Sequence, residues 1–572
     1  MLGQQTNVSV SKSSAELAEQ ATIRAVLNSY LRETKAPLET ERDVFILKLP
    51  AIGKSITGEL LYSSAIGQHA YGPVFHEIMP DGTHRQLEMS SLMRLLLDEL
   101  GAKETPDLRS AYVSQLMTHI ENSYRKMSMH LEYYQNHRQS LVNGKLDCIK
   151  SEQSLYYGHP FHPYPKSSEG FRDEELARYS PEMGAAFQLH YFAIHEELVY
   201  EEWLEGHGPK LSDEVEVHAK QQVADGAGTY KIVPMHPWQA VFVFQLPQVQ
   251  ARLQRGEIIS LGLLGPVFYP TSSVRTVWNP AGGYGYKLPL HVRITNLVRE
   301  NSWEQARRTM DAAKVIHHLR DDIQSDSFRI LSETGFTHVR IDSSVDASPY
   351  FTVIHRPIVL ENDSTYVVAS LLESFPGETE PKLIQAIRQS DQGRLPDLDL
   401  WLERYLQISL LPLMRLLANR GISFEAHLQN SLVSLKNGWP DCYYVRDLEG
   451  VSIDRQVAAQ SGWIGTLVDA DSPVLYEEVQ AWGRTKYYFI VNHLGSLIHT
   501  IAAYRQVGEE HYWRIVQKLL QQEKATAGKR LLSYLNDLLQ SDALPAKANL
   551  RSCFLKRGET PLFVDIPNPM KE

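Results

Sequence analysis

Residues 269–299 read YPTSSVRTVWNPAGGYGYKLPLHVRITNLVR, and this stretch gives the clearest sign of the fold. Apolar runs lead into and out of the segment NPAGG at 279–283, and proline with glycine is typical of a turn between strands. The stretch therefore predicts two antiparallel strands. The glycine-rich segment 282–285 opens no helix, so it is poor evidence for a dinucleotide-binding site. No P-loop sequence and no GxSxG motif occur elsewhere.

Cations and hydroxyls gather on the same stretch. Side chains alternate between the two faces of a strand, so Ser273 and Arg275 are predicted to point the same way. Cations over a buried cleft indicate an anionic ligand. An exposed, solvated sheet face is the structural alternative. If the second strand is regular, one of its faces carries Lys287, His291, Arg293 and Thr295.

A loop rich in proline, glycine and histidine precedes this region, with the sequence GHPFHPYPKSSEG at 158–170. Its prolines disfavour a helix, so His159 and His162 cannot adopt the one-turn spacing of a helical zinc site. Backbone N–H groups and cations surround anions well, which suits His162 and Lys166 in a glycine-flanked loop. The loop is predicted to bind phosphate, and a rigid surface loop is the alternative.

A second hairpin is predicted around an Asn-Gly turn at 437–438, because this dipeptide is the strongest short hairpin signal. Strand alternation would place Glu425, His427 and Gln429 on one face. The turn would bring Asp447 back opposite them. Carboxylate and amide oxygens grouped in this way suit Mg²⁺ that carries a nucleotide. A polar network inside the hairpin is the alternative.

Helices are expected on both sides of these hairpins. Ser13 and Glu16 make a capping box at the start of the first helix, and Gly421 is a plausible residue to end the last. Helices together with short strands predict an α+β fold. Helical patterns are clearest at residues 14–32, 89–100, 108–135 and 401–417.

The bulk composition excludes several classes of protein. The 572 residues carry a formal net charge of -11, which argues against a nucleic-acid partner. Cys148, Cys442 and Cys553 lie far apart, so neither a disulfide framework nor a cysteine zinc site is expected. The N-terminus lacks a signal peptide, and no run of about 18 apolar residues occurs, so no membrane partner is expected. We therefore expect a cytoplasmic protein.

Seven motifs occur in a fixed order between residues 158 and 550: GHPFHPYPKSSEG, HPWQ, PTSSVRT, KLPLHVRITN, EAHLQN, VRDLEG and KANL. Together they resemble the siderophore synthetases that work without a nonribosomal peptide synthetase, the IucA/IucC type. The resemblance implies a hand-like fold with a mostly helical thumb at 1–150 and sheet-rich fingers at 151–370. It further implies a loosely kinase-like palm at 371–572, a site between fingers and palm, and a homodimer.

The resemblance also implies a reaction. ATP with Mg²⁺ would adenylate a carboxylate of citrate, and an amine, best matched by 2,3-diaminopropionate, would then attack. The nucleotide would meet Gly158, His162, Ser273, Arg275, Thr276, Lys287, Gln429 and Asn430. The carboxylate substrate would meet Thr295, Arg299, His427, Arg484 and Lys547. The metal would be held by Glu425 and Asp447. The residues expected to act in catalysis are Arg275, Lys287, His162 and His427.

The residue types agree with that chemistry. A carboxylate that attacks the α-phosphate must overcome repulsion between two anions. Arg275, Lys287 and Mg²⁺ would neutralise the charge that develops there. Arg299 and Lys547 would suit the additional carboxylates of citrate. Histidine has a pKa suited to accepting a proton near neutral pH, which is why His162 and His427 are candidates.

Three alternatives stay open at this point. A kinase-like phosphotransferase would release ADP, although no HRD sequence or glycine-rich phosphate loop supports it. A non-catalytic binder of carboxylates or of ferric siderophores would need no ATP site. Within the resembling family, the acyl substrate could also be a citryl monoamide or another dicarboxylate.

Overall fold

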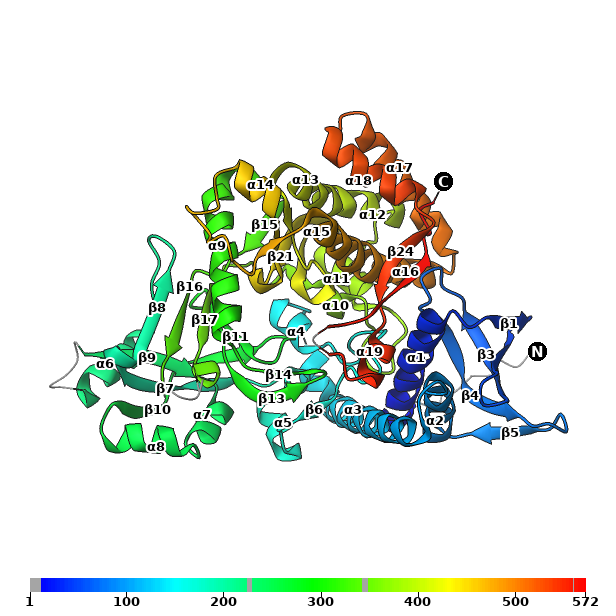
Figure 1. The fold of residues 1–572 in the computed structure, drawn as a ribbon, viewed down its shortest axis with the longest axis horizontal. Helices are drawn as coiled ribbons and strands as arrows, with labels where there is room; N and C mark the ends of the chain where they lie inside the picture. The colour runs from blue at the N-terminus through cyan, green and yellow to red at the C-terminus, as the bar shows by residue number, and fades with distance from the viewer. Residues whose placement is uncertain (1–11, 143, 224–228, 342–347, 559, 572) are drawn as a thin grey trace.

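The computed structural model describes residues 12–142, 144–223, 229–341, 348–558 and 560–571. Helices and strands are mixed along the whole chain, so the predicted α+β character is confirmed (Figure 1). Within the described ranges, no helix combines the length and the apolar character needed to cross a membrane.

The N-terminal region packs three helices with a small antiparallel sheet. Its elements are α1 (Ser14–Thr34), β1 (Leu38–Glu41), β2 (Val44–Leu49), β3 (Lys54–Tyr62), β4 (Ala70–Ile78), β5 (His84–Leu87), α2 (Met89–Leu100) and α3 (Pro106–Val142). The strands follow one another in the order β1-β2-β3-β4-β5. The predicted capping box of Ser13 and Glu16 opens α1. Val26, Phe45 and Leu96 belong to the core that joins helices and sheet.

This N-terminal core also takes up a segment from the far end of the chain. Leu550 and Phe554, from the C-terminal helix α19 (Asn549–Phe554), are buried within it. Glu33 of α1 fixes that helix, because its carboxylate accepts the backbone amides of Leu550 and Arg551, each at 2.7 Å. Figure 1 shows the red α19 beside the blue α1. The two ends of the sequence therefore build one core.

The central region is dominated by an eight-stranded sheet. Its strands are β7 (Phe187–His195), β8 (Val199–Trp203), β9 (Tyr230–Met235), β10 (Ile258–Pro270), β11 (Thr276–Asn279), β12 (Tyr284–Lys287), β16 (Gly335–Val339) and β17 (Val353–Pro357). They lie in the order β8-β16-β17-β12-β11-β10-β7-β9. The hairpin predicted around 279–283 is confirmed as β11 and β12, which pair Thr276 with Lys287.

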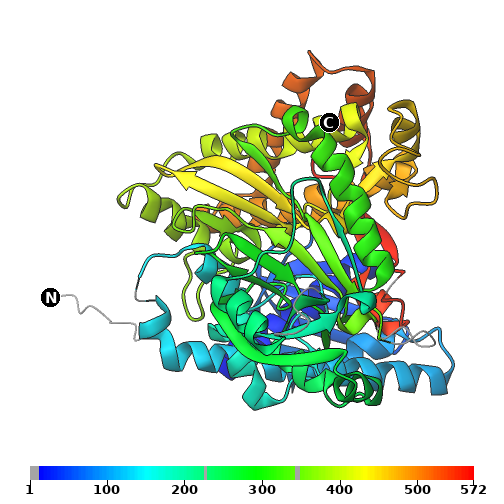
Figure 2. The same cartoon turned by 90° about the vertical axis from the view of Figure 1, so that its left-hand side faces the viewer.

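Helices and a few short strands flank this sheet (Figure 1), and Figure 2 shows the same arrangement turned by 90°. They are α4 (Cys148–Gln153), β6 (Ser168–Glu169), α5 (Asp173–Tyr179), α6 (Asp213–Gln222), α7 (Pro237–Val243), α8 (Pro247–Gln254), β13 (Leu290–Ile294), β14 (Leu297–Arg299) and α9 (Trp303–Ile323). Strands β14, β13 and β6 form a separate three-stranded sheet.

The C-terminal region sets a four-stranded sheet, β15-β21-β20-β18, among helices. Its strands are β15 (Phe328–Leu331), β18 (Thr365–Val367), β20 (Ser431–Lys436) and β21 (Trp439–Arg446). The hairpin predicted around the Asn-Gly turn is confirmed, and Asn437 and Gly438 both adopt the left-handed conformation, with φ 50° and 78°. The helix predicted from Trp401 is two helices that meet at Ser409, and Gly421 (φ 67°) ends the second.

The remaining C-terminal elements complete the largest core. They are α10 (Val368–Leu371), α11 (Lys382–Ser390), α12 (Leu398–Ile408), α13 (Leu410–Arg420), β19 (Ile422–Ser423), β22 (Ser452–Asp454), α14 (Arg455–Gln460), β23 (Leu475–Tyr476), α15 (Glu478–Thr485), a π-helix (Lys486–Leu494), α16 (Gly495–Arg505), α17 (Glu509–Lys524), α18 (Lys529–Gln540), β24 (Ala543–Lys547) and β25 (Phe563–Pro567).

Two predictions of strand geometry are wrong. The second strand of the first hairpin is not regular beyond Lys287, because Leu288 and Pro289 interrupt it and β13 joins another sheet. Lys287 is therefore buried, while Arg293 is exposed and pairs with Glu169. The segment from 424 to 430 is also no strand, since it runs irregularly into a 3₁₀ turn. Its polar side chains are positioned by loop geometry instead.

Candidate active site

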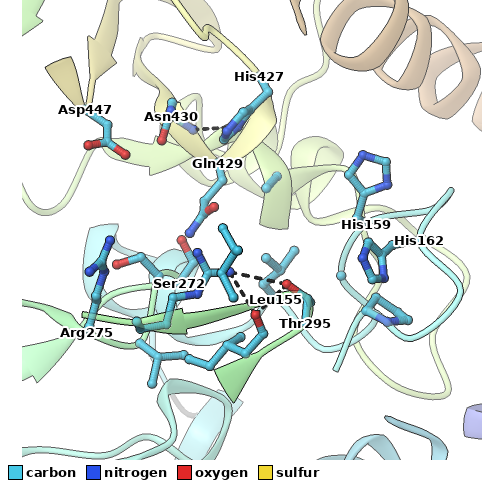
Figure 3. A pocket seen from close by; sticks show the side chains of 18 of the residues that line it. Leu155, His159, His162, Ser272, Arg275, Thr295, His427, Gln429, Asn430 and Asp447 are labelled. Carbon is cyan, nitrogen blue, oxygen red and sulfur yellow. Dashed lines mark hydrogen bonds between the residues drawn. The ribbon is translucent and has the colours of Figure 1, made fainter. Parts of the chain in front are cut away.

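One cavity of about 630 Å³ lies where the central and C-terminal regions meet, and the loop at 158–170 contributes to its lining (Figure 3). Loops supply most of its polar groups. All fifteen residues predicted for the site line this cavity: Gly158, His162, Ser273, Arg275, Thr276, Lys287, Thr295, Arg299, Glu425, His427, Gln429, Asn430, Asp447, Arg484 and Lys547. The fold brings these fifteen residues together, and their roles in the reaction stay predictions.

A buried lysine and two carboxylates form the most polar part of the cavity. Lys287 Nζ lies 2.7 Å from Asp447 Oδ1 and 2.8 Å from Glu449 Oε2. Burial lowers the pKa of Lys287, but the two carboxylates outweigh burial and raise the pKa above its ordinary value. Burial would raise the pKa of Asp447, yet Lys287 and Arg356 hold this pKa well below its usual range. All three groups are therefore charged at neutral pH.

Arg275 stands beside this cluster with no carboxylate of its own. Its guanidinium donates from Nη1 to the carbonyl of Glu300 at 2.6 Å and to Asn301 Oδ1 at 2.8 Å. Within the described ranges, no carboxylate lies within ion-pair distance of this buried side chain. Burial lowers its pKa. A held but uncompensated guanidinium is suited to an incoming anion.

A buried ion pair joins the loops on the two sides of the cavity. Arg446, at the end of β21, forms a salt bridge with Glu152 of α4, and both side chains are almost fully buried. Glu152 also accepts the backbone amide of Ser272 at 3.0 Å and its hydroxyl at 2.7 Å. Arg446 donates to the carbonyl of Gln429 at 2.9 Å. The pair therefore fixes the loop before β11 relative to the loop before β20.

Three residues other than glycine adopt the left-handed conformation around the cavity. They are Val274 (φ 67°), Thr295 (φ 55°) and Asp447 (φ 75°). This conformation is unfavourable for β-branched side chains, so the fold must hold Val274 and Thr295 in place. One visible restraint is the hydrogen bond from the amide of Thr295 to the carbonyl of Ser167, at 3.0 Å. Strained backbone concentrated at one cavity is typical of functional sites.

A second set of cations lines the cavity around Arg299, Arg484 and Lys547. Arg484 forms a salt bridge with Glu425, and Lys547 Nζ donates to the hydroxyl of Tyr488 at 2.8 Å. Burial lowers the pKa of Lys547 and, together with Arg275, lowers that of Arg299 to about 10. Arg299 Nε is buried and has no hydrogen-bond partner among the described residues. An unpaired donor of this kind points to a missing acceptor.

Of the two predicted catalytic histidines, His162 is buried and His427 is partly buried, and both are neutral. Burial lowers the pKa of His162 to about 4, and it also lowers the pKa of His427. His427 Nδ1 accepts the amide of Asn430 at 3.3 Å, a contact drawn in Figure 3, and His162 Nδ1 accepts that of Tyr164 at 3.2 Å. His162 Nε2 is buried and lacks a partner among the described residues.

The depressed pKa of His162 predicts how stability depends on pH. In the unfolded chain the imidazole has its ordinary pKa near 6.5, so it takes up a proton before the folded protein does. His162 therefore leaves the free energy of unfolding at its full value above pH 6.5, and it lowers this free energy as the pH falls from 6.5 towards 4. Because of His162, we expect the free energy of unfolding to be about 2 kcal/mol lower at pH 5 than at pH 7.

Urea unfolding of the wild type and of His162→Gln at both pH values measures this loss, since glutamine does not titrate. The wild type should lose about 2 kcal/mol more than the variant over that interval. Equal losses in the two proteins would show that His162 is not kept neutral by the fold. His511, which is exposed and pairs with Asp399 at 2.7 Å, supplies the control variant His511→Gln.

The carboxylates that could contact a divalent cation lie in two places in the cavity. Glu425 pairs with Arg484, whereas Glu449 shares Lys287 with Asp447. No group of three or more His, Cys, Asp or Glu side chains in the described ranges could hold a metal by itself. Mg²⁺ that arrives on phosphates needs only one or two protein carboxylates. Asp447 and Glu449 fit that requirement, and the part predicted for Glu425 stays a prediction.

Several residues that line the cavity were not predicted from the sequence. Glu449 lies two positions after Asp447 in the motif VRDLEG, so the motif itself was a usable signal. Arg356 reaches Asp447 Oδ1 at 3.3 Å from β17, and Arg308 enters the cavity from α9. Neither has a local pattern that marks it, because each is brought to the cavity by packing between distant segments.

Comparison with known proteins gives consistent matches along the chain. A family model described as "IucA / IucC family" matches residues 147–373, and one described as "Ferric iron reductase FhuF-like transporter" matches 399–562. L-2,3-diaminopropanoate--citrate ligase of Staphylococcus aureus (strain NCTC 8325 / PS 47) is 35% identical, over 97% of this chain and 96% of its own. Spermidine-citrate ligase of Bacillus anthracis is 26% identical, over 98% of each chain.

Solved structures share the fold. The ATP-bound aerobactin synthetase IucA from a hypervirulent pathotype of Klebsiella pneumoniae superimposes with a TM-score of 0.85, at 24% identity over 96% of this chain and 99% of that chain. The petrobactin biosynthesis protein AsbB of Bacillus anthracis str. Sterne gives a TM-score of 0.79, at 16% identity over 98% and 96%. At these identities the likeness concerns the fold alone.

Proposed function

Because this chain belongs to the IucA/IucC family of siderophore synthetases, which join citrate to an amine, we propose that it works through an acyl-adenylate and accepts 2,3-diaminopropionate. One observation supports the reaction type: a single cavity carries a cluster of Arg275, Lys287 and two carboxylates, and also a second group of cations. A triphosphate and a polycarboxylate together need such a pair of subsites.

In the proposed first step, a carboxylate oxygen of citrate attacks the α-phosphorus of ATP and pyrophosphate leaves. Arg275 and Lys287 would stabilise the negative charge that develops on the phosphorus-bound oxygens. Both side chains are held before substrate arrives, Arg275 by Glu300 and Asn301 and Lys287 by its two carboxylates. Preorganised charges need little rearrangement during the reaction, which is why we assign them to this step.

We propose that the nucleotide also meets Gly158, His162, Ser273, Thr276, Gln429 and Asn430, all of which line the cavity. Mg²⁺, bound through Asp447 and Glu449, would supply further neutralisation of the triphosphate. In the second step the amine attacks the acyl carbon and AMP leaves. The amine must be neutral when it attacks. His162 and His427 are neutral and can accept a hydrogen bond from the amine, but burial lowers the pKa of both, so neither is suited to retain the released proton at neutral pH.

The finer architectural and cellular assignments also belong to this proposal. We further propose a thumb, fingers and a palm at 1–150, 151–370 and 371–572, with a loosely kinase-like hairpin that leads to Asp447. The largest apolar core does not follow these bounds, because it also contains residues of α1, α3 and α9. One adjustment follows from the packing, because α19 of the palm segment lies in the thumb core. The protein would act in the cytoplasm, which three unpaired cysteines suit, and as a homodimer.

A pyrophosphate-release screen tests the proposed reaction. ATP and Mg²⁺ are kept constant while citrate, succinate, α-ketoglutarate and a citryl monoamide are each offered with a panel of amines, and products are identified by mass. We expect citrate to give AMP, pyrophosphate and a citryl amide. Release of ADP would establish a phosphotransferase instead. Absence of turnover with every acid would leave a carboxylate binder as the better description.

The second group of cations predicts a selective loss of citrate affinity. Thr295, Arg299, His427, Arg484 and Lys547 are proposed to surround citrate. Arg299→Ala should raise the KM for citrate roughly 10- to 100-fold, the effect of one charge-assisted hydrogen bond, with the Kd of ATP nearly unchanged. Arg293→Ala is the matched control, since Arg293 lies on the neighbouring strand, is exposed, and pairs with Glu169. A selective loss of ATP binding would mean that the two subsites are exchanged.

A further inference from the structure

Arg308 of α9 lines the same cavity but has no part in the reaction described above. Its Nη2 donates to the hydroxyl of Tyr476 at 2.5 Å and weakly to the carbonyl of Val451 at 3.4 Å. Its Nε is buried and has no hydrogen-bond partner among the described residues. The side chain is therefore held in place by neutral groups while part of its donor capacity is unused.

The charges around the cavity single out Arg308. Five lining cations face a carboxylate within ion-pair distance: Lys166, Lys287, Arg356, Arg446 and Arg484. Among the described side chains, four lining cations have no such partner: Arg275, Arg299, Arg308 and Lys547. The proposed function uses Arg275 for the triphosphate, and Arg299 and Lys547 for citrate. The proposed function assigns no anionic group of a substrate to Arg308.

The position of Arg308 places this free charge next to the acyl subsite. The ring of Tyr476 is close to two guanidinium groups, with Arg308 Cζ at 5.2 Å and Arg484 Cζ at 5.4 Å from the ring centroid. The same two arginines bind successive carbonyl groups, since Arg484 donates to Gly450 at 3.1 Å and Arg308 to Val451. Arg308 is thus the neighbour of a residue proposed to contact citrate.

We propose that Arg308 binds the carboxylate of the nucleophile, so that the enzyme selects an α-amino acid bearing a side-chain amine over a simple diamine or polyamine. The inference rests on the proposed function and deepens it. A guanidinium matches a carboxylate in shape and charge. A polyamine offers only cations to this position, and Arg308 would repel them.

Two amines that differ in one group test the proposal. 2,3-Diaminopropionate and 1,2-diaminoethane share both nitrogen atoms and their spacing, and only the first has a carboxylate. We expect kcat/KM of the wild type to be roughly 10- to 100-fold higher for diaminopropionate, as expected for a charge-assisted hydrogen bond. Arg308→Gln should remove most of this difference by lowering the value for diaminopropionate, chiefly through KM, and it should not lower the value for diaminoethane.

The neighbouring residue provides the matched control. Arg307 pairs with Asp469 and Asp471, each at 2.9 Å, and does not line the cavity. Arg307→Ala should therefore keep the wild-type preference. If Arg308→Gln lowers turnover of both amines equally, Arg308 has only a structural role and the proposal is overturned. A wild-type enzyme that uses diaminoethane or spermidine as well as diaminopropionate overturns it too.

Citrate-dependent exchange between ATP and radiolabelled pyrophosphate separates this inference from the proposed function. The exchange needs no amine, so it reports adenylation alone. Exchange in both the wild type and Arg308→Gln, with loss of amine discrimination only in the variant, supports the assignment of Arg308. Absence of exchange in the wild type overturns the adenylation proposal and this inference with it. Exchange together with unchanged discrimination in Arg308→Gln overturns the inference alone.

Discussion

Arg275→Ala is expected to lower citrate-dependent pyrophosphate release by roughly 100- to 10,000-fold, the scale of losing one preorganised partner of transition-state charge. The residue is buried beside the Lys287 cluster, has no carboxylate partner among the described residues, and is fixed by Glu300 and Asn301. Its charge is therefore available to the nucleotide and already in place. Initial rates with saturating ATP and citrate measure the effect.

The conservative variant distinguishes charge from packing. Arg275→Lys keeps a cation but loses the planar fork, so it should recover only part of the lost rate. Circular dichroism and thermal unfolding must show that both variants are folded. A folded Arg275→Ala protein with near-normal release of pyrophosphate would remove this residue from the mechanism.

Glu152→Ala should destabilise the fold by about 3–5 kcal/mol, the range for breaking a buried ion pair by removing one partner. The substitution leaves the guanidinium of Arg446 buried without its carboxylate and also frees the amide and hydroxyl of Ser272. Chemical unfolding monitored by intrinsic fluorescence measures the change. Activity should fall as well, because the loops that face each other across the cavity lose their common anchor.

Two controls separate the buried pair from an ordinary surface one. Glu39→Ala removes the carboxylate that Lys48 contacts at 2.6 Å, and this exposed pair should contribute about 1 kcal/mol or less. Replacing both Glu152 and Arg446 by apolar residues of similar volume should restore part of the stability, because no unpaired charge stays buried. A loss below about 1 kcal/mol in Glu152→Ala would show that water reaches Arg446.

The parts of the fold that could be predicted are those encoded locally. The turns at 279–283 and 437–438 predict their hairpins because only a few residue types adopt the required backbone angles. Ser13 and Glu16 mark a helix start for a similar reason, since their side chains satisfy free amides of the first turn. Most cavity residues could be named because they lie within short motifs that resemble a known family, whereas Arg299 and Arg484 lie outside these motifs.

What could not be predicted depends on contacts between distant segments. The interruption at Leu288 and Pro289 sends β13 into another sheet, and strand alternation alone gave no sign of it. Arg308 sits in a helix whose pattern of apolar residues is ordinary, and only packing against β23 brings it to the cavity. Glu449 lies within the motif VRDLEG, but its contact with Lys287 joins positions 162 residues apart and is set by the fold.

The hydrogen bonds from Glu33 to the start of α19 have a consequence for how the protein is made. The ribosome releases the N-terminal helix α1 first, and the amides that donate to Glu33 follow 517 and 518 residues later. Until then this carboxylate and the apolar surface that receives Leu550 and Phe554 have no native partner. Lys547 arrives in the same final segment, so a growing chain cannot bind citrate as proposed. Catalytic competence is thus confined to chains whose synthesis has passed α19.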